Sequence, residues 1–420
     1  MLFVSRMCPF PEWDGESIRT GSLLRGLASR HRITLVTRVR NDVEQQALRR
    51  EQHLFVTVHL FRFAPMSRTA IARKALGSPK WWLLPVRVPA FCFEEIGAAV
   101  KALLASDEFD CVVFDHMALA HYLAFVPGSF RGIRVLNLHN LESLLQRRAM
   151  KLSGSLPLRM LGLADAVRMR LFEGRMLPRF DCILSASSRE TAIIRARAPG
   201  VEVIDVPNGV ARTQPIVDAG GSARELDRIL FVGTLNYLPN EDGICWFVSR
   251  ILPLIRARVP GAILTIVGHR PTPRLRRMLG PGTQLHESPE TVEAFYQRAA
   301  VAVVPLRAGS GSRHKILEAL VHRVPVVTTG IGAEGLELEP GRHYLRADGV
   351  RAFASAVERA IADPAAGAAQ VDRALPIIRE RYSWVLIARS ASDALAALVD
   401  RRAAARRLLS TGSACAVSAG

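Results

Sequence analysis

The amino-acid sequence predicts an α/β protein with two Rossmann-like, doubly wound domains. Short runs of apolar, β-branched residues alternate with helical segments along most of the chain, a pattern typical of parallel sheets covered by helices. The pattern begins with a strand, a loop, a helix and a second strand in residues 2–37, and it restarts in the same order at residue 228. The length of 420 residues is also enough for two or three domains.

Composition restricts the class of partner. The chain carries a formal net charge of +18, and 49% of its residues are hydrophobic. The hydrophobic content is sufficient for buried cores, while the charge favours an anionic partner such as a phosphorylated substrate, a phospholipid surface or nucleic acid. Aromatic residues that could stack on bases cluster only around residues 81–93, so we expect no nucleic-acid partner.

Cysteines and apolar runs indicate the cellular compartment. The six cysteines are scattered without CxxC spacing, which argues against a metal site and against a disulfide framework. The first residues lack the shape of a signal peptide, and no apolar run is long enough to span a bilayer. These features predict a reduced, cytoplasmic setting.

Residues 1–210 are expected to form the first domain, in which strands and helices alternate. The expected order is a strand at 2–5, a loop and helix at 6–31, strands at 32–37 and 53–63, a helix at 93–106, strand-led units at 109–126 and 132–149, a basic helical stretch at 151–180, a strand and helix at 180–194, and a closing segment at 202–210.

Polar residues follow several of these strands, and the ends of parallel strands form the ligand edge of a doubly wound sheet. Gly15 lies where the first loop meets its helix, so free backbone N–H groups there could face a ligand. Two more groups follow consecutive strands, namely Asp115 and His116, then His139, Asn140 and Glu142. The alternatives are an ordinary turn and histidines that serve only the core, but two histidines at consecutive strand ends favour a site.

The segment from residue 68 to residue 91 mixes basic residues with Trp81, Trp82, leucine and phenylalanine. This composition fits an interfacial membrane segment, in which each basic residue near an anionic leaflet contributes about 1 kcal/mol. The alternative is a surface helix whose tryptophans pack inward. The segment therefore suggests peripheral association with an anionic membrane, on the inner face of the plasma membrane.

The second half has its own predicted boundaries. Residues 211–226 lose hydrophobic periodicity and read as a linker. Residues 227–385 are expected to form the second Rossmann-like domain, and residues 386–404 a C-terminal helix. The tail at 405–420, basic and then small and polar, is predicted to be disordered.

The stretch 301–329 is expected to form a strand, a glycine-bearing loop, a helix and another strand. Its loop contains Gly309 and Gly311, which allow close approach of a ligand to the backbone, and two serines that can cap the helix. Lys315 and Glu318 lie three residues apart on the face opposite the apolar stripe. A helix N-terminus beside cations suits a phosphate, and the carboxylate suits hydroxyls, so we predict a nucleotide-sugar site; the alternative is an ordinary α/β loop.

Several motifs resemble those of the GT4 family of retaining glycosyltransferases, which have the GT-B fold. The motifs occur in the family's order: HNLESLLQRR at 139–148, VPNGV at 206–210, EAL with PVV in the 301–329 stretch, and GAEGL at 332–336. A Tyr-Leu-Pro-Asn turn at 237–240 is similar to that of a bacterial branch associated with exopolysaccharide assembly. The resemblance implies two Rossmann-like domains facing a central cleft, with the last helix crossing back onto the first domain.

The resemblance also implies roles for individual residues. His116 falls near the histidine that approaches the transferred sugar, and Glu318 matches the glutamate that holds the donor ribose; both are predicted to be catalytic-site residues. The residues predicted to bind the donor phosphates are Gly15, Gly311, Ser312, Arg313 and Lys315. Contacts with the sugar or the acceptor are predicted for Ser310, which replaces the first glutamate of the family's pair, and for His139, Asn140, Glu142 and Arg19.

The predicted function is retaining transfer of a sugar from a nucleotide-diphosphate donor to a hydroxyl of a glycan or lipid-linked glycan, in cell-surface polysaccharide synthesis. The resemblance implies no metal and no other cofactor, and the sequence contains no DxD motif. Two alternatives remain. One is a sugar-nucleotide epimerase on the same fold, and the other is a non-catalytic GT-B binding protein. The second is favoured by Ser310 and by a first C-terminal-domain loop with Thr234 and without the family's arginine and lysine.

Overall fold

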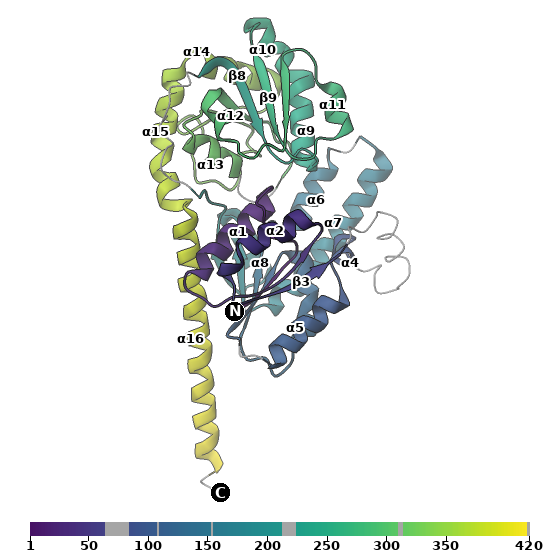
Figure 1. The fold of residues 1–420 in the computed structure, drawn as a ribbon, viewed down its shortest axis with the longest axis vertical. Coiled ribbons are helices and arrows are strands. Elements are labelled where there is room, and N and C mark those ends of the chain that lie inside the picture. The colour runs from purple at the N-terminus through teal and green to yellow at the C-terminus, as the bar shows by residue number, and fades with distance from the viewer. Residues whose placement is uncertain (64–83, 107–108, 153, 212–223, 310–313, 418–420) are drawn as a thin grey trace.

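The computed structural model describes the chain except residues 64–83, 107–108, 153, 212–223, 310–313 and 418–420. In this described part, the strands form two separate parallel sheets, one of seven strands and one of six. Figure 1 shows the sheets in two domains stacked along the long axis of the molecule. The prediction of an α/β protein with two doubly wound domains is confirmed.

The N-terminal sheet has the strand order β3-β2-β1-β4-β5-β6-β7 among the described residues. Its strands are β1 (Leu2–Ser5), β2 (Thr34–Val39), β3 (Thr57–Arg62), β4 (Cys111–Asp115), β5 (Ile133–Asn137), β6 (Cys182–Ser185) and β7 (Glu202–Asp205). Its helices are α1 (Gly15–Ala28), α2 (Asp42–Arg50), α4 (Arg87–Ala90), α5 (Glu94–Ser106), α6 (Glu142–Met150), α7 (Leu156–Met176) and α8 (Ser188–Arg197), with short 3-10 turns at Gln52–Leu54, Met117–Phe125 and Leu177–Arg179.

The central strands of this sheet are buried on both faces. Leu2 and Val4 pack into one apolar cluster with Phe114, while Phe3 and Val113 pack into the cluster on the opposite face. Alternating residues of a strand point to opposite faces, so a strand covered on both sides must be apolar throughout. This requirement explains the continuous apolar runs that predicted the strands.

The C-terminal sheet has the order β10-β9-β8-β11-β12-β13 within the described chain. Its strands are β8 (Glu225–Val232), β9 (Ile263–Gly268), β10 (Thr283–Glu287), β11 (Ala299–Val304), β12 (Val326–Thr328) and β13 (Leu345–Arg346). The helices around it are α9 (Leu238–Trp246), continued by a π-helical turn at Phe247–Ile251, α10 (Leu252–Arg258), α11 (Pro273–Met278), α12 (Glu293–Arg298), α13 (His314–Val321), α14 (Val350–Ala362) and α15 (Pro364–Arg381).

The last helix, α16 (Trp384–Val417), crosses from the C-terminal domain onto the N-terminal domain, as Figure 1 shows. Trp384 and Leu395 are buried in the core of the N-terminal domain. Gly26 of α1 allows the contact, because a Cβ atom there would lie 2.1 Å from the Cβ of Ala388. The helix continues through Val417, so the prediction of a disordered tail from residue 405 is wrong for residues 405–417. Helical propensity explains the difference, since alanine, arginine and leucine dominate the start of that segment.

Three predicted features lie outside the described residues. They are most of the basic aromatic segment, including Trp81 and Trp82, most of the linker, and the loop residues Ser310, Gly311, Ser312 and Arg313. Among the helices that the structure describes, none is long and apolar enough to cross a membrane.

Candidate active site

Asp115 is the centre of a buried polar network at the carboxyl edge of the N-terminal sheet. β4 and β5 are neighbours in parallel register, so Asp115 pairs with Asn137 at the same edge. Asp115 Oδ1 accepts hydrogen bonds from Asn137 Nδ2 at 2.6 Å and from His139 Nε2 at 2.8 Å, and its Oδ2 accepts one from Thr20 Oγ1 of α1 at 2.8 Å. The network therefore joins α1, the end of β4, and the end of β5 with its following loop at one carboxylate.

Burial alone would raise the pKa of Asp115, but His139 and the hydrogen bonds from Thr20 and Asn137 hold this pKa below its ordinary value. The carboxylate is thus charged at neutral pH and fixes the His139 ring with its Nε2–H toward Oδ1. Arg19 extends the network, since it donates to Asn137 Oδ1 at 3.0 Å and to the carbonyl of Val206 at 2.6 Å. Arg19 is fully buried, and burial lowers its pKa to about 10.

His116 directly follows Asp115 and is held in one tautomer. Its Nδ1 accepts a hydrogen bond from the N–H of Ala118 at 3.0 Å, so Nε2 carries the proton and faces Glu142 Oε1 at 3.2 Å. Burial and the nearby Arg6 lower the pKa of His116 to about 4, against the opposing effect of Glu142. The backbone φ of 110° at His116 lies in a region that side chains other than glycine rarely adopt. His116 is therefore a neutral, strained residue at the sheet edge.

The α1 N-terminus faces a cavity between the two domains. Asp14 caps the helix by accepting from the N–H of Ser17 at 2.9 Å, and a Cβ atom at Gly15 would meet no other atom within 4 Å. The backbone at Gly15 is therefore sterically accessible, and a phosphate contact there stays a prediction. Arg6 forms an ion pair with Glu16 at this end of the helix.

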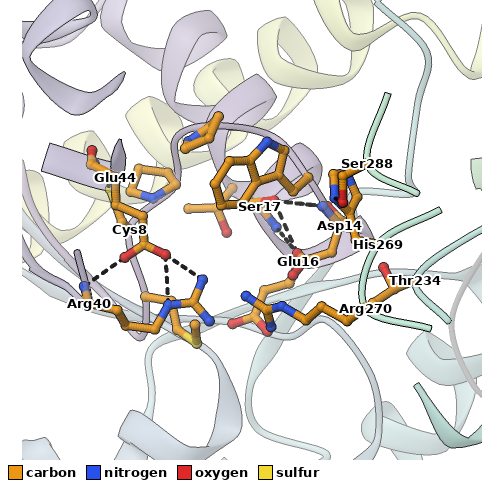
Figure 2. A pocket seen from close by; sticks show the side chains of 15 residues that line it. Cys8, Asp14, Glu16, Ser17, Arg40, Glu44, Thr234, His269, Arg270 and Ser288 are labelled. Atoms are coloured by element: carbon orange, nitrogen blue, oxygen red, sulfur yellow. Dashed lines mark hydrogen bonds and ion pairs between the residues drawn. The ribbon is translucent and has the colours of Figure 1, made fainter. Parts of the chain in front are cut away.

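The cavity has a volume of about 290 Å³ and is lined by both domains. Figure 2 shows Arg40 and Glu44 on one side, and Thr234, His269, Arg270 and Ser288 of the C-terminal domain on the other. Arg270 extends toward the centre of the cavity (Figure 2), and the ring of Trp13 lies 5.7 Å from that of His269 across the domain boundary. Thr20 lines the cavity and also bonds to Asp115, so it connects the open space to the buried network.

Lys315, in the first turn of α13, points to the end of β8. Its Nζ donates to Asn240 Oδ1 at 2.8 Å and lies 4.7 Å from the centre of the Phe231 ring. A Cβ atom at Gly233 would lie 2.8 Å from this ammonium, so the glycine leaves the space that Lys315 occupies. Because Thr234 follows Gly233 and lines the cavity, the cation lies next to the cavity wall.

Glu318 lies one turn further along α13 and is half-buried. Its Oε2 accepts a hydrogen bond from the hydroxyl of Tyr296 at 3.1 Å, and the Tyr296 ring is stacked on His322 at 4.7 Å. Burial, followed by the charge of Glu318, raises the pKa of Tyr296 well above its ordinary value, so the phenol remains a donor. Tyr296 therefore fixes one oxygen of the carboxylate.

Direct contacts hold the two domains together beside the cleft. Arg148 of α6 donates to the carbonyl of Gly309 at 2.8 Å and forms an ion pair with Glu334, which also pairs with Arg189. His314 Nδ1 lies 2.8 Å from the carbonyl of Gly209. The residues on either side of the 310–313 segment, Gly309 and His314, thus contact the N-terminal domain at two points.

The predicted site residues fall into two groups in space. Arg19, His116, His139 and Glu142 belong to the buried N-terminal edge, with Asn140 on the same loop, whereas Lys315 and Glu318 belong to the C-terminal helix. Gly15 is exposed at the N-terminus of α1, between Asp14 and Glu16, which line the cavity.

Several residues of this region were missed as site residues. Asp115 was noted at a strand end, but its role as a shared acceptor depends on the neighbouring strand and on Thr20. Glu334, like Asp115, is a carboxylate that follows an apolar run in the sequence. Its two arginine partners belong to the other domain, so the sequence alone could not pair them. The sequence around Tyr296 does not indicate a site residue, because a tyrosine in a helix is usually part of the core.

Comparisons with known structures support the fold. Sucrose-phosphate synthase from Thermosynechococcus elongatus is similar with a TM-score of 0.68 and 18% sequence identity, covering 95% of this chain and 99% of that one. HepE from Anabaena, solved in complex with UDP and glucose, gives a TM-score of 0.65 and 12% identity, covering 94% and 99% of the two chains. The chain has the GT-B arrangement of two Rossmann-like domains.

Sequence comparison concerns the second domain. Residues 227–363 match the family model described as glycosyl transferases group 1. An uncharacterized 44.6 kDa protein in the cps region of Klebsiella pneumoniae is 29% identical over 136 residues, which are 30% of this chain and 35% of that protein. The match thus spans about a third of this curated relative. The fold and the family match together support a GT-B glycosyltransferase.

Proposed function

We propose that the protein is a retaining glycosyltransferase of the GT4 type. It transfers a sugar from a nucleotide-diphosphate donor to a hydroxyl of a glycan or lipid-linked glycan. HepE, which shares the fold, was solved with UDP and glucose, and the curated relative is encoded in a cps region. These two facts support a nucleotide-sugar donor and a role in cell-surface polysaccharide synthesis. We propose the cytoplasmic face of the membrane as the place of this reaction.

The observation that carries the proposal is the position of Lys315 and Glu318 within the group 1 segment. The two side chains lie one turn apart on α13, with Lys315 against the glycine that ends β8. An ammonium at this place suits a diphosphate, and a carboxylate one turn away suits the hydroxyls of a ribose. We assign diphosphate binding to Lys315 with the 311–313 loop and Gly15, and ribose binding to Glu318.

In the proposed reaction, the bond between the sugar C1 and the diphosphate oxygen breaks, and a bond between C1 and the acceptor oxygen forms on the same face. The acceptor proton passes to an oxygen of the departing diphosphate. Lys315 stabilises the negative charge that develops on that diphosphate, which is where a fixed cation lowers the barrier most. No metal or other cofactor is required.

His116 is proposed to contact the transferred sugar. Its neutral tautomer is set by the Ala118 N–H, so Nε2–H is the atom that can donate to a sugar hydroxyl in place of Glu142. His139, Asn140, Glu142, Arg19 and Ser310 are proposed to shape the sugar and acceptor sides of the cleft. Because Asp115 holds His139 in place, substrate contact at His139 would be made by its Nδ1 side.

The first test is thermal stabilisation by a panel of UDP-, GDP-, ADP- and TDP-sugars. A ligand at 100 times its dissociation constant adds about 2.7 kcal/mol to the free energy of unfolding, which produces a clear rise in Tm. Stabilisation by one nucleotide class is the expected result. A folded protein that responds to none of the four classes would contradict the proposal of a donor site.

Variants then test the assigned residues. Lys315→Ala and Glu318→Ala should abolish the response while leaving the melting temperature of the free protein near its original value. Lys101→Ala, an exposed lysine on α5, is the control and should respond normally. Once an acceptor is found, proton NMR of the product gives the anomeric configuration, and inversion would overturn the retaining mechanism.

A non-catalytic GT-B binding protein is the second candidate. It is favoured by Ser310 in place of a glutamate and by Thr234 in a loop that lacks a lysine or arginine. Such a protein would show the thermal shift without consuming the donor. An epimerase on the same fold would convert the donor without an acceptor, whereas a glycosyltransferase would consume it only with one. Product analysis of the donor with and without an acceptor therefore distinguishes the three functions.

A further inference from the structure

Helix α7 exposes an unusual amount of apolar surface. Leu156, Met160, Val167 and Leu171 are 69%, 61%, 60% and 56% exposed. With Ala164, which is also exposed, they recur every three or four residues and therefore form one stripe along the helix. An exposed apolar stripe of this kind indicates a surface that binds another molecule or a membrane.

The opposite face of α7 is the one that packs into the protein. Met169 and Phe172 are buried in the core cluster of the N-terminal domain, and Ala166 and Met176 are also buried. Figure 1 shows α7 beside α6 on the side of the N-terminal domain, next to the C-terminal domain. The apolar stripe is thus not needed for the packing of α7 on its own domain.

The charges around the stripe have one sign. At 100° per residue, Arg159 and Arg170 lie on one flank of the stripe, and Arg168 and Arg175 lie on the other. The two carboxylates of α7, whose residues are all described, face elsewhere. Asp165 accepts from the N–H of Val86 at 2.9 Å and pairs with Arg168, and Glu173 is fully buried with Ser143 and Arg197.

We propose that this face of α7 docks on an anionic lipid bilayer, with the stripe in the headgroup region and the arginines against lipid phosphates. Apolar side chains flanked by cations on a helix of low overall hydrophobicity are the features of an interfacial helix. A second copy of the same face is disfavoured, because it would bring two sets of arginines together without an exposed carboxylate from either α7.

This surface belongs to residues 156–176 and is therefore distinct from the segment at 68–91 from which membrane association was predicted. Most of that earlier segment lies outside the described residues. Binding of lipid by α7 does not require glycosyl transfer. The lipid-binding surface and the cleft are nevertheless connected, because α7 packs on α6, which carries Glu142 beside His116 and Arg148 beside Gly309. Docking through α7 would hold the cleft near the bilayer.

Flotation of the full-length protein with vesicles tests the proposal. Vesicles of phosphatidylcholine and phosphatidylglycerol at 3:1 should carry the protein, and pure phosphatidylcholine vesicles should not. Val167→Glu with Leu171→Glu should lower the partition coefficient at least tenfold, because the stripe loses apolar area and gains negative charge. The control, Val385→Glu with Leu226→Glu, changes the net charge equally at two other exposed apolar positions and should bind normally.

A second set of variants tests the charges alone. Replacing Arg159, Arg170 and Arg175 by Gln should lower the partition coefficient roughly 100-fold, at about fivefold per basic residue. The matched control replaces three exposed arginines of other helices, Arg49, Arg50 and Arg351, by Gln and should retain most of the binding. Circular dichroism melts confirm that each variant is folded.

Three results would overturn the proposal. The first is that the folded wild-type protein fails to float with anionic vesicles. The second is that each control set loses as much binding as its α7 counterpart, which would make the attraction a general effect of net charge. The third is a dimer in sedimentation velocity that Val167→Glu with Leu171→Glu dissociates, in the absence of vesicle binding. This result would assign the stripe to a second copy.

Discussion

The two sides of the cleft are built differently. On the N-terminal side, Asp115, Asn137, His139 and Arg19 are buried and bonded to one another. On the C-terminal side, Lys315 and Glu318 are half-buried on one helix and bonded to Asn240 and Tyr296. On the N-terminal side the polar groups are buried and contribute to the stability of the fold, whereas on the C-terminal side the charged groups are accessible to a ligand. Variants should therefore affect stability on the first side and ligand binding on the second.

The largest expected effect is that of Asp115→Ala on stability. The change leaves His139, Asn137 and Thr20 without their shared acceptor in a buried place, and breaking such a network costs about 3–5 kcal/mol. Urea unfolding measures the loss. Asp205→Ala is the control at the same sheet edge, where the carboxylate is exposed, and it should cost less than about 1 kcal/mol. Equal losses would show that Asp115 has no special structural role.

The next effect is a loss of stability in mild acid caused by His116. Its pKa of about 4 in the folded protein lies below the ordinary value near 6.5, so the unfolded chain binds more protons between these pH values. Stability therefore falls as the pH falls from 6.5 to 4, by up to about 3 kcal/mol from this group. Burial also lowers the pKa values of His31, His269 and His343, which act in the same direction.

His116→Asn isolates this contribution, because asparagine tolerates a positive φ better than most residues. Urea unfolding at pH 7 and at pH 4.5 should show a smaller pH dependence in the variant than in the wild type. Asp115 does not interfere, since its lowered pKa places its loss of stability below about pH 4. An unchanged pH dependence would show that His116 does not resist protonation in the folded protein.

Gly233→Ala should produce a smaller effect, on the C-terminal side. The added Cβ would lie 2.8 Å from Lys315 Nζ and 2.9 Å from Asn240 Nδ2, so the ends of both hydrogen-bonded side chains must shift. We expect the fold to persist and the affinity for the stabilising nucleotide to fall about tenfold, which corresponds to one displaced charged hydrogen bond. Titration calorimetry measures this change. Gly128→Ala, where a Cβ meets no atom within 4 Å, should bind normally.

The smallest effect is expected where the two sides meet. Arg148→Ala removes the ion pair with Glu334 and the hydrogen bond to Gly309, which together contribute about 1 kcal/mol to the closed arrangement. Small-angle X-ray scattering of the free protein should show a larger radius of gyration. Arg298→Ala removes an ion pair with Glu225 inside the C-terminal domain and should leave that radius unchanged. No difference between the two variants would mean that Arg148 does not hold the domains together.

The expected α/β fold with two doubly wound domains followed from local patterns. Apolar runs predicted β4 and β5, and their parallel ends predicted that Asp115, His116 and His139 would lie at one edge. The restart after residue 227 coincides with the segment that matches group 1 glycosyltransferases. These features depend on residues that are near in sequence or on a rule that holds for every parallel sheet.

Only the tertiary structure decided which groups meet. Thr20 reaches Asp115 from α1, Arg148 and Arg189 reach Glu334 from the other domain, and the tail after residue 405 is helical. The exposure of the stripe on α7 could likewise not be predicted from the sequence, because an amphipathic helix has the same periodicity whether its apolar face is buried or exposed. The sequence by itself determined the strands, helices and strand-end residues; burial and contacts between distant segments depend on how those elements pack, since packing brings together side chains that local patterns cannot pair.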